Sequence, residues 1–428
     1  MSAHRDDSAM AVIGRLEEEL GRSLSAMIEI SDRCNEVCVH CYQVQGQKGE
    51  MTTEQIFGVI DDLANNGILL LTISGGEVLL RSDFLDIVAH ARKRSFLIRI
   101  FTNGLLMDER IASELGRLAV ETVEISLYSH MAETHDFVTG VPNSFSRTVA
   151  GIRALIAHGV PVVVKTPIMS VNEHQMEDYA AFVESLGARL RVDPTAMMPR
   201  EGGSNAPWAL NAGDEATLSL TKRHRDERSP AIRRRSEDSI SCGAGLGVHI
   251  EPNGQLRPCT ILELDLGNVK EHGLHAVQAN NEVLSGLTSI RYRDLHGCRD
   301  CEISGHCGRC FAQALAETGD ALGPYPSACK SARLHYEAQE GVPLRIENAA
   351  ERGDVGPYRI TSHSSCMVIE DRISEADERL AKKLGWVRQA AVTTPVLPVR
   401  RGELVQLRRP GKARSVELRV PTGLSGQT

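Results

Sequence analysis

The chain has 428 residues, enough for two or three domains, and 42% hydrophobic residues allow a sizeable core. A formal net charge of −8 argues against a nucleic-acid-binding surface. No apolar stretch approaches the roughly 20 residues that span a bilayer, and Met1–Glu19 lacks the apolar core of a secretory signal. We therefore expect a cytoplasmic protein with neither a membrane nor a nucleic acid as its partner.

Six short apolar runs, several rich in Val and Ile on both faces, are typical of parallel strands buried on both sides. They are Ala26–Ile30, Ile68–Ile73, Leu97–Phe101, Val120–Leu127, Val160–Thr166 and Leu190–Val192. Thr52 or Thr53 can cap a helix that runs to Asn66. Ser82 can cap the next helix, and Ser144 opens another. Six βα units in series predict an α/β fold, a partial (β/α)6 TIM-like barrel with its chemistry in the loops after the strands.

The eleven cysteines are many for a cytoplasmic chain, where disulfides rarely persist, so metal or cluster ligation is the leading explanation. Three fall within Cys34–Cys41, seven within Cys242–Cys329, and Cys366 stands alone. This distribution predicts two cysteine-bearing modules separated by a cysteine-free scaffold. A lone cysteine is most often a buried inert thiol, and a remote ligand is the alternative for Cys366.

The cysteine spacing and a dense run of charges divide the chain into five segments. We expect an N-terminal segment (1–24), the barrel (25–221), a charged linker (222–240), a small cysteine-rich domain (241–346) and a C-terminal extension (347–428).

Two hairpins are predicted, each from two short runs joined by a turn: Val248–Pro252 with Gln255–Pro258, and Leu404–Arg408 with Ser415–Val420. The first contains Asn253-Gly254, a strong two-residue turn signal. Ser374–Leu384 predicts a short helix in the extension. Residues 391–428 hold seven Lys and Arg against two Glu, a surplus of five positive charges. This basic tail could dock a peptide, although a solvated hairpin is the commoner outcome.

Cys34, Cys38 and Cys41 follow the first predicted strand with three and then two intervening residues. Three thiolates on one loop can hold three irons of a cubane cluster and leave the fourth iron open for a chelating substrate. A zinc site is the alternative, but structural zinc takes four ligands and His40 is poorly placed to supply the fourth.

The next three strands also end in polar motifs, which are Ser74-Gly75-Gly76-Glu77, Thr102-Asn103-Gly104 and Ser126-Leu127. Together with the cysteine triplet, this series resembles the radical S-adenosylmethionine (SAM) superfamily. The resemblance implies that Cys34, Cys38 and Cys41 are the catalytic cluster ligands. It also implies cofactor contacts, including the amino group of SAM at the Gly-Gly-Glu loop and its ribose at Ser126. The expected cofactor-binding residues are Tyr42, Gly75, Gly76, Glu77, Thr102, Asn103, Ser126 and Arg147.

The seven later cysteines resemble the SPASM domain, the auxiliary-cluster extension of radical SAM peptide maturases. By that resemblance one 4Fe–4S cluster takes Cys242, Cys259 and Cys310. The ligands of a second, fully ligated cluster are then Cys298, Cys301, Cys307 and Cys329. A four-thiolate zinc site within 298–310 is the alternative, and it leaves three of the seven cysteines unexplained.

The resemblance implies an oxidoreductase that cleaves SAM to a 5′-deoxyadenosyl radical and abstracts hydrogen from a ribosomally made peptide or protein, which is crosslinked or otherwise oxidised. An electron donor such as flavodoxin or ferredoxin is an expected partner. Only about 25 residues precede the first strand, too few for a leader-binding domain, so a separate leader-peptide-binding protein is another expected partner. The alternatives are a maturase of sulfatases, an enzyme that modifies tetrapyrroles, and an inactive zinc- or cluster-binding scaffold.

Overall fold

The computed structural model describes residues 9–20, 22–43, 46, 49–193, 235–262, 264–340, 404–408 and 415–419. The chain divides into two compact units, and each is described by itself. The barrel unit contains Arg5–Asn211, Leu246–Ala279 and Val396–Thr428. The cysteine-rich unit contains Met1–His4, Ala212–Gly245 and Asn280–Pro395. Most of the predicted linker, Cys366 and the predicted helix Ser374–Leu384 lie outside the described residues. Within the described residues, no helix is long and apolar enough to cross a membrane.

The barrel unit is built on an eight-stranded sheet with the order β6-β5-β4-β3-β2-β1-β7-β8. Its first six strands pair in chain order and are all parallel. They are β1 (Ser25–Glu29), β2 (Leu70–Ser74), β3 (Leu97–Thr102), β4 (Thr122–Ser126), β5 (Val162–Pro167) and β6 (Arg189–Asp193). The predicted partial barrel of six βα units is therefore confirmed.

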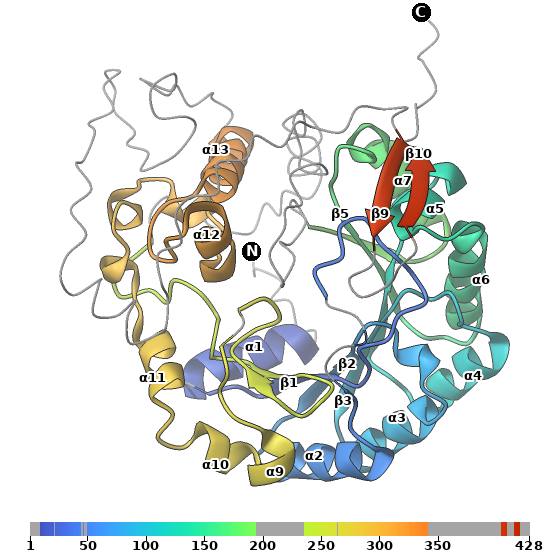
Figure 1. Ribbon diagram of the computed structural model, residues 1–428, viewed down its shortest axis with the longest axis horizontal. Coiled ribbons are helices and arrows are strands. Elements are labelled where there is room, and N and C mark those ends of the chain that lie inside the picture. The colour runs from blue at the N-terminus through green and yellow to red at the C-terminus, as the bar shows by residue number, and fades with distance from the viewer. Residues whose placement is uncertain are drawn as a thin grey trace, which may run out of the picture. The chain divides into compact units, whose positions relative to one another are not determined.

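Helices cover the outer face of this sheet, as Figure 1 shows for α2, α3, α4 and α6. The helices of the barrel unit are α1 (Ala9–Leu20), α2 (Thr53–Asn65), α3 (Phe84–Lys93), α4 (Glu109–Arg117), α5 (Ala132–Thr139), α6 (Ser144–Ala157) and α7 (Met176–Ser185), with short 3₁₀ turns η1 (Val78–Leu80) and η2 (Glu173–Gln175). Residues on the outer face, such as Ile28, Ile73 and Ile125, are buried and apolar. The opposite face mixes buried apolar residues such as Leu70 and Val163 with charged ones, including Arg99 and Glu124.

Local side chains fix where these helices begin. Thr52 caps α2 in a capping box with Gln55, so of the two predicted caps, Thr52 and Thr53, the first is confirmed. The prediction that Ser82 caps α3 is wrong, because Asp83 occupies the N-cap and its carboxylate pairs with Arg81 instead of a helix N–H. The helix α6 begins at Ser144 as expected.

The hairpin around Asn253-Gly254 forms from β7 (Val248–Ile250) and β8 (Leu256–Arg257), as predicted. Its first strand pairs in parallel with β1, which would otherwise be the edge of the sheet. The hairpin and the following α9 (Val269–His272) and α10 (Leu274–Gln278) thus belong to the barrel unit. The sequence analysis expects a separate cysteine-rich domain from residue 241. In the structure, residues 246–279 are instead part of the barrel unit, because β7 pairs with β1.

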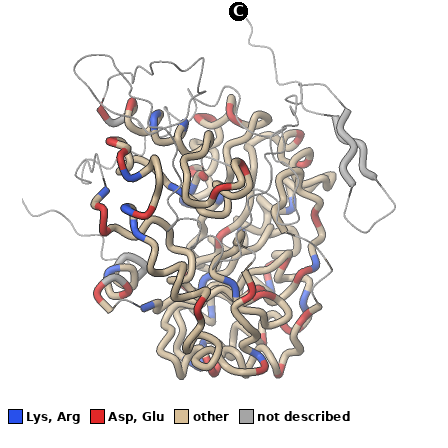
Figure 2. The backbone as a smooth tube through the Cα atoms, turned by 60° about the vertical axis from the view of Figure 1, so that its left-hand side comes forward, with Lys and Arg blue, Asp and Glu red and all other residues tan. Residues whose placement is uncertain are grey.

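The cysteine-rich unit consists of short helices and turns. They are α11 (Glu282–Ser289), η4 (Tyr292–Asp294), η5 (Cys298–Asp300), η6 (Ser304–His306), α12 (Phe311–Thr318) and α13 (Pro326–Glu340). The second predicted hairpin also forms, with β9 (Leu404–Arg408) antiparallel to β10 (Ser415–Arg419), and it is assigned to the barrel unit. Basic and acidic residues are interspersed along the described chain (Figure 2).

Candidate cluster and cofactor site

The loop that carries Cys34, Cys38 and Cys41 leaves the carboxyl end of β1 and is held against the end of α5. The backbone N–H groups of Val37 and Val39 donate to carbonyl oxygens of α5, at 2.8 and 2.9 Å. A further bond from the N–H of Cys41 to the carbonyl of Cys38, 3.1 Å, closes a turn between the last two cysteines. The three predicted ligands therefore lie on one loop at the edge of the sheet where the chemistry is expected.

The three thiols are close enough to interact electrostatically. Burial raises the pKa of Cys34 to about 12, and Cys41 adds to this shift. Burial also raises the pKa of Cys38, with Glu36, Cys41 and Cys34 adding to it. Glu36 Oε2 accepts from Cys38 Sγ at 3.3 Å, and burial raises the pKa of this carboxyl to about 8. Iron binds thiolates, so cluster assembly would displace protons that burial holds on these thiols.

Three cysteines on one loop are a donor set that fits a cubane cluster with one open iron. Among the described residues, no three His, Cys, Asp or Glu side chains converge on a site for a single metal ion. A cubane differs from such a site because each of its thiolate ligands binds a separate iron.

Gly75 and Gly76 pack against the backbone that leads into the cysteine loop. A Cβ on Gly75 would lie 2.4 Å from the carbonyl oxygen of Ser31, and one on Gly76 would lie 2.4 Å from that of Arg33. The N–H groups of Gly76 and Glu77 donate to these same two oxygens, each at 2.8 Å. The two glycines therefore allow the loop after β2 to pack closely against the start of the cysteine loop.

The Glu77 carboxylate is fully buried and connects the loops after β2 and β3. It accepts hydrogen bonds from Thr102 Oγ1 at 2.6 Å, Asn103 N at 2.7 Å and Leu79 N at 2.9 Å. Burial raises the pKa of Glu77, while these bonds favour the carboxylate. Two carboxylate oxygens offer about four acceptor positions, so one is left for a further donor.

Asn103 extends this unit to the cysteine loop. Its Nδ2 donates to Asn35 Oδ1 at 2.7 Å and lies 3.9 Å from Cys34 Sγ. The predicted motifs after β1, β2 and β3 therefore form one hydrogen-bonded assembly.

Tyr128, which the sequence analysis missed, lies two residues beyond the end of β4, beside the second cysteine. Its hydroxyl lies 3.8 Å from Cys38 Sγ and hydrogen-bonds with the predicted ribose contact Ser126. The His40 ring meets the Tyr128 ring edge-on at 4.9 Å, and the His135 ring stacks on it at 5.5 Å. The only sequence signal was its place two residues beyond Ser126, where side chains of a strand share a face.

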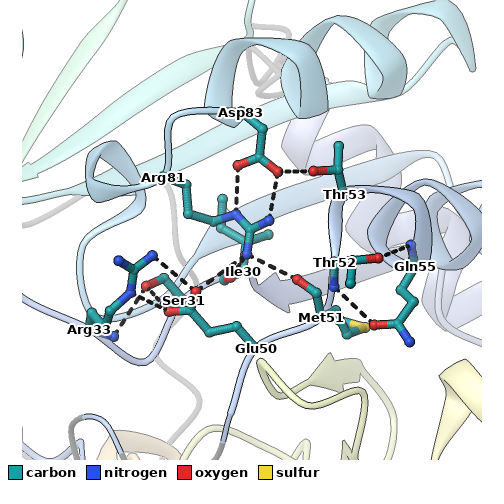
Figure 3. A network of polar contacts seen from close by, with 10 residues as sticks. All are labelled: Ile30, Ser31, Arg33, Glu50, Met51, Thr52, Thr53, Gln55, Arg81 and Asp83. Carbon is teal, nitrogen blue, oxygen red and sulfur yellow. Dashed lines mark hydrogen bonds and ion pairs between the residues drawn. The ribbon is translucent and has the colours of Figure 1, made fainter.

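Arg81, also missed, joins both ends of the cysteine loop (Figure 3). Its Nη1 donates to the carbonyls of Ile30 and Met51, each at 3.1 Å, and its Nε and Nη2 bind both oxygens of Asp83. Glu50, next to Met51, accepts in turn from Arg33 and Ser31 at the start of the loop. This network had no sequence signal because its side chains are ordinary polar residues on three separate segments.

The other expected cofactor contacts are less closely tied to this assembly. Tyr42 is partly buried beside Cys41. Arg147 is exposed on α6, and its charge lowers the pKa of Glu36 against the larger effect of burial.

In the cysteine-rich unit, the four residues predicted for the second auxiliary cluster gather together. Cys301 and Cys307 pack against a buried group that contains Cys329. Burial raises the pKa of Cys307 to about 12, and the nearby Cys298 and Cys301 add to it. Cys242 and Cys310 belong to the same unit, whereas Cys259 belongs to the barrel unit.

Three curated relatives resemble this chain over most of its length. The AdoMet-dependent heme synthase of Methanosarcina barkeri is 28% identical over 330 residues, 70% of this chain and 94% of that protein. The antilisterial bacteriocin subtilosin biosynthesis protein AlbA of Bacillus subtilis is 29% identical over 311 residues, 69% of each chain. The PqqA peptide cyclase of Xanthomonas campestris pv. campestris is 26% identical over 386 residues, 83% of this chain and 98% of that protein.

The fold is also that of a solved structure, native anSMEcpe with bound AdoMet. That structure superposes with a TM-score of 0.60 at 17% identity, covering 74% of this chain and 97% of the other. Residues 28–186 match the family model described as the radical SAM superfamily, and this range contains the cysteine loop and every strand-end motif described above. Residues 28–186 therefore form a radical SAM domain, and the enzyme uses the 4Fe–4S cluster and SAM of that superfamily.

Proposed function

We propose that this enzyme abstracts hydrogen from a ribosomally made peptide or protein, which it crosslinks or oxidises. The observation that supports this substrate class best is the similarity to PqqA peptide cyclase, which extends over 83% of this chain. The relationship to the bacteriocin biosynthesis protein AlbA points to the same class.

Cys34, Cys38 and Cys41 would hold the catalytic cluster, which when bound supplies the electron that cleaves SAM to methionine and a 5′-deoxyadenosyl radical. The protein's own part is to fix the loops around these ligands. Glu77 and Asn103 connect the loops after β2 and β3 to the cysteine loop. We propose Glu77 as the acceptor for the amino group of SAM and Ser126 as the contact for its ribose.

For the cysteine-rich unit we propose the auxiliary clusters of a SPASM domain. The packing of Cys301, Cys307 and Cys329 supports the second of these clusters. The proposed ligands of the first are Cys242, Cys259 and Cys310, and Tyr42 and Arg147 remain proposed cofactor contacts. We further propose a cytoplasmic enzyme that receives electrons from a flavodoxin or ferredoxin and binds its peptide with the help of a separate leader-binding protein.

Anaerobic purification followed by iron and sulfide analysis and SAM cleavage assays tests the chemistry. We expect 5′-deoxyadenosine from the parent chain and none from the variant in which Cys34, Cys38 and Cys41 are replaced by Ala. Persistent 5′-deoxyadenosine in this variant would contradict the assignment of the catalytic cluster, and zinc without sulfide would favour the scaffold alternative.

A tetrapyrrole substrate is the second candidate, because the heme synthase similarity covers 94% of that relative. Parallel assays with a heme precursor and with the precursor peptide encoded nearest to this gene distinguish the two candidate substrates. We expect the peptide to stimulate 5′-deoxyadenosine formation and to lose hydrogen mass. Stimulation by the heme precursor alone would reject the peptide proposal.

A further inference from the structure

Arg309 is a buried arginine with incompletely used hydrogen-bond donors. It lies between Cys307 and Cys310 in the chain and is only 7% exposed. Its Nη2 donates to the carbonyl oxygens of Ala321 and Gly323, at 2.5 and 2.6 Å, which fixes the guanidinium in place. Its Nε and Nη1 are buried without an oxygen or nitrogen acceptor among the described residues, and the guanidinium lies within hydrogen-bonding reach of the Cys298 thiol. Such unsatisfied donors on a buried charge are costly, so a missing acceptor is indicated.

The surroundings of Arg309 contain thiols and aromatic rings. Burial raises the pKa of the Cys298 and Cys307 thiols, and the positive charge of Arg309 acts in the opposite direction. The guanidinium carbon lies 5.3 Å from the ring centre of Phe311 and 6.0 Å from that of Tyr325. Within the described part of the chain Arg309 forms no ion pair with a carboxylate.

The acid near Cys298 is already engaged elsewhere. Asp320 Oδ2 lies 2.5 Å from His296 Nε2, and this histidine ring is itself mostly buried. The positive charge of Arg309 therefore faces the cysteines with no carboxylate to neutralise it in the described structure. An anionic group bound by these cysteines would supply both the charge and the acceptors that Arg309 lacks.

We propose that Arg309 donates hydrogen bonds to the sulfur atoms of the auxiliary cluster bound by Cys298, Cys301, Cys307 and Cys329, and that it thereby raises the reduction potential of this cluster. This inference rests on the auxiliary cluster in the proposed function. A cubane with four thiolate ligands is an anion, and reduction makes it more negative. A fixed cation with N–H groups directed at sulfur stabilises the reduced form more than the oxidised form.

The test measures redox potential rather than turnover. In the variant with Cys34, Cys38 and Cys41 replaced by Ala, only auxiliary clusters remain, and an EPR-monitored redox titration reports them alone. We expect Arg309→Gln to move one auxiliary potential to a more negative value and Arg309→Lys to move it less. The matched control is Arg299→Gln, which removes a 52% exposed charge beside Cys298 and should leave the potential unchanged because solvent screens it.

An unchanged potential in Arg309→Gln with full iron and sulfide would overturn the inference. If Arg309→Gln fails to retain its cluster, Arg309→Lys decides the question, and an unchanged potential at full occupancy then rejects the role of Arg309. A parent chain whose cysteine-rich unit holds zinc or no sulfide would contradict the auxiliary cluster itself, which is a different failure.

Discussion

At the scale of single residues, backbone packing requires a glycine at position 76. Any side chain at this position meets the carbonyl oxygen of Arg33, with the Cβ at 2.4 Å. We expect Gly76→Ala to displace the cysteine loop and to lower the iron and SAM bound by the catalytic cluster severalfold, with less effect on the auxiliary clusters. Iron analysis and SAM binding check this result.

Gly58→Ala is the matched control for this substitution. A Cβ on Gly58, inside α2, would have nothing within 4 Å. Replacing a helical glycine by alanine should stabilise the chain by about 0.5–1 kcal/mol and leave iron binding unchanged. Equal iron content in both variants would contradict the packing argument.

His135 gives the barrel unit a pH-dependent stability. Its Nδ1 accepts from the backbone N–H of Tyr128 at 3.1 Å, its Nε2 has no partner among the described residues, and burial lowers its pKa to about 4. An unfolded histidine, with a pKa near 6.5, takes up a proton as the pH falls, whereas the folded one stays neutral until about pH 4. The free energy of unfolding should therefore fall between pH 6.5 and 4, by up to ~3 kcal/mol.

Urea unfolding of the iron-free chain at several pH values measures this loss. We expect His135→Asn, which keeps an acceptor for the Tyr128 N–H but does not titrate, to reduce the pH dependence. His40, whose pKa burial also lowers to about 4, should still contribute to it. A variant with the same pH dependence as the parent would show that His135 is not the group responsible.

At the scale of elements, the strands and most helix starts could be predicted because their signals are local. Short apolar runs, several of them rich in Val and Ile, mark the six parallel strands, and Thr52 with Gln55 marks the start of α2. The Ser82 cap was mispredicted because a residue pattern does not show that Asp83 binds Arg81. The strand-end motifs were found for the same local reason, whereas Tyr128 and Arg81 act through contacts that only the folded chain brings together.

The contacts of Arg81 suggest that this side chain holds the two ends of the cysteine loop in place. The Arg81 side chain is only 8% exposed, and it binds two carbonyls and a carboxylate at once. Lysine cannot reproduce this fork of donors, so Arg81→Lys should lower the free energy of unfolding by about 2–4 kcal/mol and reduce iron in the catalytic cluster. Urea unfolding and iron analysis measure the two effects.

Arg117→Lys serves as the control for Arg81→Lys. Arg117 pairs with Glu114 on the exposed surface of α4, with 67% of its side chain exposed. Exposed pairs contribute little, so this change should leave the free energy of unfolding and the iron content nearly unchanged. Similar losses in the two variants would show that Arg81 has no special role.

At the scale of the whole molecule, the pairing of β7 with β1 could not be predicted, because it joins a three-residue strand to a partner far away in the sequence. It follows that a chain ending at residue 211 leaves the edge of β1 unpaired. Exposed strand edges promote association, so we expect this truncated chain to aggregate. A second chain, with 212–245 replaced by a Gly-Ser linker of equal length and ending at residue 279, keeps β7 and should remain monodisperse. Sedimentation compares the two, and equal behaviour would mean that β7 does not protect the barrel sheet.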